Sequence, residues 1–262
     1  MASPQTIQPA IADTSIFQAN PTSNYGSLDS VYVAAYAGDR RKVILKFDFS
    51  AVVPAGQTIT LATLSLYCST SRASRTITVY RLLRTDWAET QATYNIYKTG
   101  SDWGTAGAYN SSTDFTTTGV ATATSVAASN WLNETVTVQV QTALDSVSGI
   151  AHFLLVDEGT WTAGQNIYNS DEYATANLRP KLYIEYAPPW TDPTGINIGD
   201  AWKVADWPGS KLNVGDAWKA VRTVKVNISD VWKRVYSSPA ILNEDATYIL
   251  LESGTDDRIE VE

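Results

Sequence analysis

The chain has 262 residues, 44% of them hydrophobic and 11% aromatic, so it can bury a sizeable core and wholesale disorder is excluded. Its formal net charge is -8, and residues 241–262 carry most of it, with seven acids against Arg258. No basic surface for neutralising phosphate groups is expected, which excludes nucleic acid as a partner.

The N-terminal segment MASPQTIQPAIADTS has no basic start followed by an apolar stretch, so we expect no secretory signal and folding in a cytoplasm. No apolar run reaches the length of about 18 residues that a membrane helix needs, so no membrane insertion is expected. Cys68 is the single cysteine, which excludes an intrachain disulfide. It lies in the strand-like segment LSLYCST, where a thiol is usually a small buried hydrophobe.

Alternation of apolar and polar residues predicts strands through the first part of the chain. In KVILKFDFS, the residues Val43, Leu45, Phe47 and Phe49 share one face. The same pattern recurs at residues 135–140 and 181–186, and further strands are predicted at 59–68, 76–83 and 150–156. One short helix is expected at 140–147. This pattern predicts an all-β fold, with a jelly-roll β-sandwich over residues 1–187.

Prolines then interrupt the strand pattern. The segment YAPPWTDPTG contains three prolines, which cannot donate to a sheet ladder, so we expect a Pro-rich linker at residues 188–195. Three ten-residue repeats follow, INIGDAWKVA, LNVGDAWKAV and VNISDVWKRV, and we expect three β-hairpins over residues 196–236. An acidic C-terminal segment with short strands is expected at 237–262.

Several short motifs occur in a distinctive order over residues 10–187. They are NYG at 24–26, KFD at 46–48, Trp87 and Glu89 followed by ATYN, and finally SDE and RPKL at 170–172 and 179–182. In this order the segment resembles the DNRLRE-type domain, a relative of carbohydrate-binding module family 96. The resemblance implies a jelly-roll sandwich and polysaccharide binding. Gln139 stands where family members tend to carry an aspartate, which argues against an ion held by that position.

The sequence has one histidine and one cysteine, so few residues of the types used in catalysis are present. His152 is the single histidine and lies in the apolar run IAHFLLV, so we expect a buried sheet residue rather than a catalytic base. Zinc sites of the His/Cys type are excluded, because the chain has too few histidines and cysteines to supply the ligands. Trp87 and Glu89 are read as a core anchor and its neighbour on one face of a strand. We therefore expect no enzyme, no catalytic residue and no cofactor, although a depolymerase using two carboxylates is kept as a less favoured alternative.

Glycan binding requires exposed aromatic rings beside polar groups. Trp103, Tyr109 and Trp161 lie among Gly, Ser, Asn and Asp residues, and we take them as the candidate glycan-binding residues. The alternative is that these rings fold back over the sandwich. Calcium could use oxygen ligands such as Asp13 and Asn24, but no calcium motif is present, so a metal is left open.

Each C-terminal repeat reads as a hairpin with one tryptophan, too small to bury its own indole. A two-residue turn would place Trp202 opposite Asn197, and a three-residue turn would place it opposite Ile198; the register is left open. The repeats could pack on one another, or they could dock onto a neighbouring sheet. Docking is our preferred interpretation, with the assembly candidates Trp202, Trp218, Trp232, Ile198, Val214 and Ile228.

Serial hairpins of this type with a terminal YILLESGTDDRIEVE resemble structural proteins of tailed bacteriophages. The combined resemblances imply a virion structural protein, either a capsid decoration, a head fibre or a minor tail component. We expect it to display a carbohydrate-binding-like domain on the virion surface and to attach through its hairpins. The expected partners are other virion proteins, sister chains in a homo-oligomer such as a trimer, and a polysaccharide. A free polysaccharide-binding module is the alternative.

Overall fold

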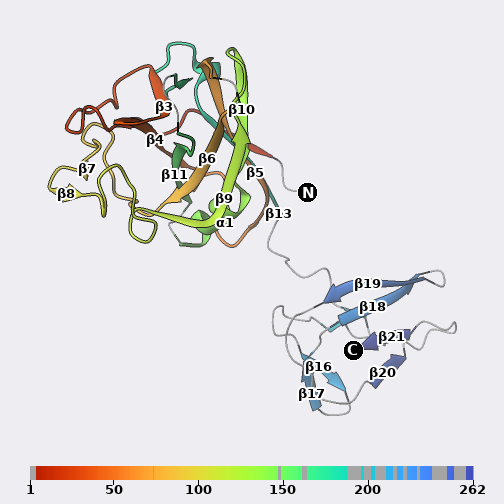
Figure 1. The fold of residues 1–262 in the computed structure, drawn as a ribbon. Coiled ribbons are helices and arrows are strands. Elements are labelled where there is room, and N and C mark those ends of the chain that lie inside the picture. Colours follow the sequence, from red (N-terminus) through yellow and green to blue (C-terminus); the bar gives the residue numbers. More distant parts are fainter. Residues whose placement is uncertain are drawn as a thin grey trace. The chain divides into compact units, whose positions relative to one another are not determined.

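The computed structural model describes residues 4–72, 74–146, 149–160 and 164–187, and beyond these only the strands within residues 196–261. The chain divides into two compact units, Met1–Pro189 and Trp190–Glu262, each with its own sheets (Figure 1). The expected linker at 188–195 lies outside the described residues. Within the described part of the chain, no helix has the length and apolar character needed to span a membrane.

The regular secondary structure of the first unit is thirteen strands, one short helix and one 3-10 turn among the described residues, so the predicted all-β sandwich is confirmed. Its elements in chain order are β1 (Gln5–Ile7), β2 (Ala12–Phe17), β3 (Ser30–Tyr36), β4 (Asp39–Asp48), β5 (Thr58–Thr70), β6 (Thr76–Leu82), β7 (Ile96–Lys98), β8 (Ser101–Asp102), β9 (Phe115–Thr124), β10 (Asn130–Thr135), α1 (Thr137–Ser146), β11 (Ile150–Asp157), β12 (Asn166–Asn169), the 3-10 turn η1 (Ala176–Leu178) and β13 (Lys181–Ala187).

One curled antiparallel sheet forms both layers of the sandwich. Its order is β1-β13-β5-β12-β3-β4-β11-β6-β9, with β10 added to β5 and β2 added to β4. Strand β3 joins the two layers, because Tyr32 and Val33 pair with β12 whereas Ala34 and Ala35 pair with β4. We call the layer of β1, β13, β5, β10 and β12 the β5 layer, and the layer of β2, β4, β11, β6 and β9 the β4 layer.

The main core lies between the two layers. From β4 it receives Val43, Leu45 and Phe47, followed by Phe49, which is the face predicted from the sequence. Cys68 of β5 is fully buried in the same core, as expected. The alternation therefore identified the inward face of both layers correctly.

A second, smaller core covers the outer face of the β4 layer. The segment 83–114, which contains β7 and β8, folds over this face and buries Trp87 and Trp103 against Ile44 and Leu154. The sequence predicted a half-buried β4, and the structure differs because this segment shields its outer side. Trp87 and Glu89 lie in this segment outside any strand, so their expected strand was wrong, whereas the buried indole is confirmed.

Helix α1 begins at Thr137 and replaces most of the strand predicted at residues 135–140. Val136 and Val140 are buried four residues apart, while Val138 between them is 55% exposed, which is the spacing of a helix and not of a strand. Gln139 is buried, and its Nε2 donates to the carbonyls of Val79 and Gly119 at 2.7 and 2.8 Å. The Gln139 side chain therefore links α1 to the sheet through two hydrogen bonds.

Replacing Gln139 with alanine should lower the free energy of unfolding by about 2 kcal/mol, since two carbonyl groups would lose a buried donor. Urea unfolding followed by fluorescence measures the change. The neighbouring Val138→Ala is the control and should change stability by less than about 0.5 kcal/mol. Equal effects of the two substitutions would contradict this role for the amide.

The second unit contains short strands only, among the residues that the structure describes there. They are β14 (Ile196–Asn197), β15 (Trp202–Lys203), β16 (Lys211–Val214), β17 (Ala217–Ala220), β18 (Thr223–Ile228), β19 (Val231–Ser237), β20 (Thr247–Leu250) and β21 (Arg258–Val261). Strands β14 and β15 form one hairpin and β16 and β17 a second. The third hairpin belongs to a four-stranded sheet of order β19-β18-β21-β20.

All three hairpins share one register. The paired residues are Asn197 and Trp202, Asn213 and Trp218, and Asn227 and Trp232. Val214 pairs with Ala217 and Ile228 with Val231, which leaves two residues for the turn. The register is thus that of a two-residue turn. Of the assembly candidates, Ile198 lies outside the described residues.

Candidate functional site

The three predicted glycan-binding residues have different surroundings. Trp103 is buried, and its Nε1 donates to the carbonyl of Thr93 at 2.9 Å, so it does not offer the free ring that we expected. The physical reason is the second core, which needs this indole to cover the β4 layer. Tyr109 is 37% exposed and keeps an accessible ring. Trp161 lies outside the described residues.

The outer face of the β5 layer carries aromatic residues that the sequence reading missed. Strand β5 lies between β10 and β13, with Trp131 opposite Tyr67, and with both Asn133 and Lys181 opposite Ser65. The intervening residues of all three strands, such as Leu66, point into the main core. Hence the residues of the other parity face outward. We call this surface, made of Tyr67, Trp131, Asn133, Lys181 and Tyr183, the Trp131 face.

Three side chains of the Trp131 face contact one another. The rings of Tyr67 and Trp131 meet edge to face with centroids 5.3 Å apart, and Lys181 Nζ lies 4.0 Å from the Trp131 ring centroid. Asn133 Oδ1 accepts a hydrogen bond from Ser65 Oγ at 2.7 Å. Both rings are part-exposed and Asn133 is exposed. The surface thus combines aromatic rings with an amide and an ammonium group, the mixture that binds a sugar ring and its hydroxyl groups.

Two of the motifs that carry the family resemblance, NYG and the segment that follows Trp87, meet at one corner of the first unit. Asn24 Nδ2 donates to the carbonyls of Glu89 and Ala92 at 2.6 and 2.8 Å, and Asn24 Oδ1 accepts from Gly26 N. Glu89 Oε1 in turn accepts from Asp13 N at 2.7 Å. These bonds fasten the segment 83–114 to β2 and to the β2–β3 loop. Asn24 and Glu89 therefore have a structural role in holding the second core in place.

The model of carbohydrate-binding module family 96 matches residues 4–186, which is most of the chain. The chain belongs to carbohydrate-binding module family 96. The resemblance drawn from NYG, Trp87 and Glu89, and SDE is thereby confirmed for the first unit. No curated protein matches the chain.

In this family 96 domain, the corner leaves no room for a side chain at Gly26. A Cβ there would lie 2.9 Å from the Glu89 carbonyl carbon and 2.7 Å from its Cγ. Gly26→Ala should therefore push the 83–114 segment outward and lower the free energy of unfolding by about 2 kcal/mol. Gly56→Ala serves as the matched control for a glycine in open space, although its φ of +78° costs about 1 kcal/mol. A thermal shift no larger for Gly26→Ala than for the control would contradict the close contact.

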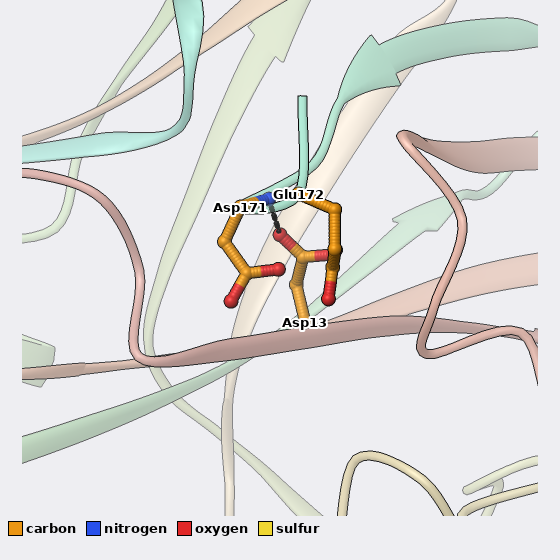
Figure 2. A group of neighbouring side chains, drawn as sticks. All are labelled: Asp13, Asp171 and Glu172. Carbon is orange, nitrogen blue, oxygen red and sulfur yellow. Dashed lines mark hydrogen bonds between the residues drawn. The ribbon is translucent and has the colours of Figure 1, made fainter. Parts of the chain in front are cut away.

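Beside this corner of the family 96 domain, three carboxyl groups converge. Asp13, Asp171 and Glu172 each offer an oxygen within 4.8 Å of the others (Figure 2). Asp171 N donates to Asp13 Oδ2 at 2.8 Å, and Asp171 Oδ1 is buried without a hydrogen-bond partner. Asp13 is 1% exposed. Figure 2 shows the three side chains pointing toward one another from β2 and from the turn after β12.

Burial raises the pKa values of Asp13 and Asp171 in this cluster. Burial, with the nearby Glu172 and Asp13 carboxyls adding to it, raises the pKa of Asp171 to about 9. Burial is also the main cause that raises the pKa of Asp13 and of Glu89. Such a group can share protons, or it can bind a hard cation such as Ca²⁺ through its oxygens. Of the two calcium ligands considered from sequence, Asp13 belongs to this cluster, whereas the Asn24 amide is occupied by the backbone of 89–92.

The single histidine of this family 96 domain is a buried residue of β11, as expected. His152 Nδ1 accepts a hydrogen bond from Trp87 Nε1 at 3.1 Å, and His152 is 5% exposed. Burial, assisted by the charge of Lys46, lowers its pKa to about 4. The imidazole is therefore neutral at pH 7 and acts as an acceptor for the buried indole.

Proposed function

We propose that the first unit binds a polysaccharide through the Trp131 face and does so without catalysis. The observation that carries this proposal is the outward row of Trp131, Tyr67 and Lys181 on the β5 layer, in a chain that belongs to carbohydrate-binding module family 96. The strands hold the two rings in fixed places, so a sugar binds with little loss of side-chain freedom.

The polar groups of the Trp131 face can hydrogen-bond a sugar and so fix its orientation. Asn133 keeps its Nδ2 as a donor, because only its Oδ1 is used by Ser65. Lys181 is long and flexible, and it can turn from the Trp131 ring to a hydroxyl or acidic group of the sugar. Tyr183 OH donates to Glu185 at 2.6 Å, which leaves lone pairs of both groups for sugar hydroxyls.

Affinity electrophoresis tests this proposal. The full chain is run through gels containing hydroxyethyl cellulose, xylan, galactomannan, polygalacturonate or carboxymethyl cellulose. At least one polymer should retard the protein, and the same polymer should release no reducing ends or unsaturated products after incubation. Unchanged migration in every gel would contradict binding, and product release would support the depolymerase alternative.

We further propose that the chain is a structural component of a bacteriophage virion that displays this unit on the particle surface. The support is the three hairpin repeats with a shared register of Asn opposite Trp. The third hairpin is extended by β21, which pairs with β18, whereas the first two are two-stranded among the described residues. Two-stranded hairpins are marginal alone, so we expect docking onto sister chains or other virion proteins.

Mass spectrometry of purified phage particles tests the virion role. The chain should be present at a fixed copy number, as a capsid or tail component, after assembly in the bacterial cytoplasm. Light scattering of the purified chain should show a homo-oligomer. A chain absent from particles, monomeric and still able to bind polysaccharide would favour the free module.

A further inference from the structure

We propose a second sugar-binding site on the 83–114 segment, centred on Tyr109 and Tyr94, which makes one chain bivalent for polysaccharide. This proposal rests on the proposed polysaccharide binding but uses a different surface. The Trp131 face lies on the outer side of the β5 layer, and the 83–114 segment covers the outer side of the β4 layer. With the main core between them, the two sites face in opposite directions.

The Tyr109 ring has a buried ammonium group against one of its faces. Lys42 Nζ lies 3.2 Å from the ring centroid, and Lys42 itself is 3% exposed. Because the ammonium lies against one face of the ring, the 37% exposure of Tyr109 leaves an open surface to solvent. A partly exposed ring with a cation fixed against one face is suited to stacking on a pyranose ring.

The backbone just before Tyr109, at Gly107 and Ala108, has an unusual conformation that Lys42 stabilises. Lys42 Nζ donates to the carbonyls of Gly107 and Ala108 at 2.8 and 3.1 Å. Ala108 has φ +54°, a left-handed conformation that costs a non-glycine residue about 1 kcal/mol. Such conformations persist where surrounding contacts enforce them, often at binding sites. Here a buried ammonium enforces the conformation and fixes the loop under Tyr109.

Tyr94 lies beside the same loop. A Cβ at Gly107 would be 2.7 Å from Tyr94 Cζ and 2.9 Å from Tyr109 Cε2, so both rings pack against this glycine. Gly107 N also donates to the Tyr94 carbonyl at 2.6 Å. The two rings therefore form adjoining parts of one surface, and only a residue without a side chain fits between them.

Charged groups border the two rings. The Arg40 guanidinium is close enough to the Tyr109 hydroxyl to oppose the rise of its pKa, which burial causes. Glu158 is exposed, and its Oε1 accepts from Tyr80 OH at 2.6 Å, which leaves Oε2 for a ligand. Glu158 also acts on Lys42, whose pKa is lowered by burial to about 7. A guanidinium donor and a carboxylate acceptor near the Tyr109 ring match the hydroxyl groups of a sugar.

The test uses the polymer of the gel series that retards the wild-type chain most. Four full-length proteins are compared: wild type, Trp131→Ala, Tyr109→Ala and the double variant. Each single variant should keep part of the retardation with the apparent dissociation constant raised at least about tenfold, and the double variant should migrate as in a gel without polymer. Tyr109→Phe keeps the ring and should stay within about twofold of wild type.

A tyrosine outside both sites provides the folding control. Tyr173→Ala should migrate like wild type, and circular dichroism should show the same fold for all variants. If Tyr109→Ala changes nothing, both alone and together with Trp131→Ala, the second site is refuted while the proposed function stands. If Trp131→Ala alone removes all retardation, the second site is likewise refuted. If no polymer retards the wild-type chain, the proposed function itself fails and takes this inference with it.

Discussion

Replacing Trp131 with alanine should weaken polysaccharide binding at least about thirtyfold at the Trp131 face, a loss of about 2 kcal/mol. The substitution removes the largest ring of the face and also the partner of Tyr67 and Lys181. The fold should persist, because Trp131 faces outward and its neighbour Leu132 carries the core contact of β10. Isothermal titration calorimetry with fragments of the retarding polymer measures the affinity at this face.

Two matched variants separate the loss of ring stacking from a loss of stability. Trp131→Phe keeps an aromatic ring and should lose less than about fivefold in affinity. Trp103→Phe alters an indole of the second core, so it should lower the melting temperature without a comparable loss of affinity. A larger affinity loss for Trp103→Phe than for Trp131→Ala would contradict our choice of site.

Glu134→Gln should make the protein more stable than wild type at alkaline pH by about 2 kcal/mol, with little difference at pH 5. Glu134 points inward from β10, is 1% exposed, and its Oε1 has no hydrogen-bond partner. Burial raises its pKa to about 8, although a backbone hydrogen bond from Ala123 opposes the shift. The folded state therefore prefers the protonated acid.

The direction of the pH effect follows from this shift. A folded pKa above the unfolded value means that the folded state binds the proton more tightly, so the contribution of Glu134 is fully present below about pH 4.5. It decreases as the pH rises and is lost once the pH passes about 8. Urea unfolding at several pH values measures it, with the exposed Asp102→Asn as control. Parallel stability curves for wild type and Glu134→Gln would contradict the raised pKa.

Strand alternation predicted much of the fold because sheet layers expose one face and bury the other. It identified the inward residues of β4 and β13, and the turn residues predicted the C-terminal hairpins. It failed within residues 135–140, where Val136, Val138 and Val140 alternate like a strand but the chain enters α1 at Thr137. Branched residues favour strands locally, and contacts with the main core overrode that preference.

The candidate site was harder to predict, because it depends on which faces are covered. Trp103 was expected to be free, but the 83–114 segment turns its indole into the second core. Trp131 was passed over, although NWLNET alternates outward Trp131 and Asn133 with inward Leu132 and Glu134. That alternation was a usable signal. The acid cluster could not be predicted, since Asp13 and Asp171 are far apart in sequence and meet only through the sheet.

Nuclear magnetic resonance of the full chain tests the proposed binding surface most directly. The indole N–H signal of Trp131 is assigned from its absence in Trp131→Phe, and fragments of the retarding polymer are then added. We predict that this signal moves in a saturable way, together with the side-chain amide of Asn133 and the backbone amides of Tyr67 and Tyr183. Saturable binding that leaves all of these signals unmoved would contradict the Trp131 face as a polysaccharide site.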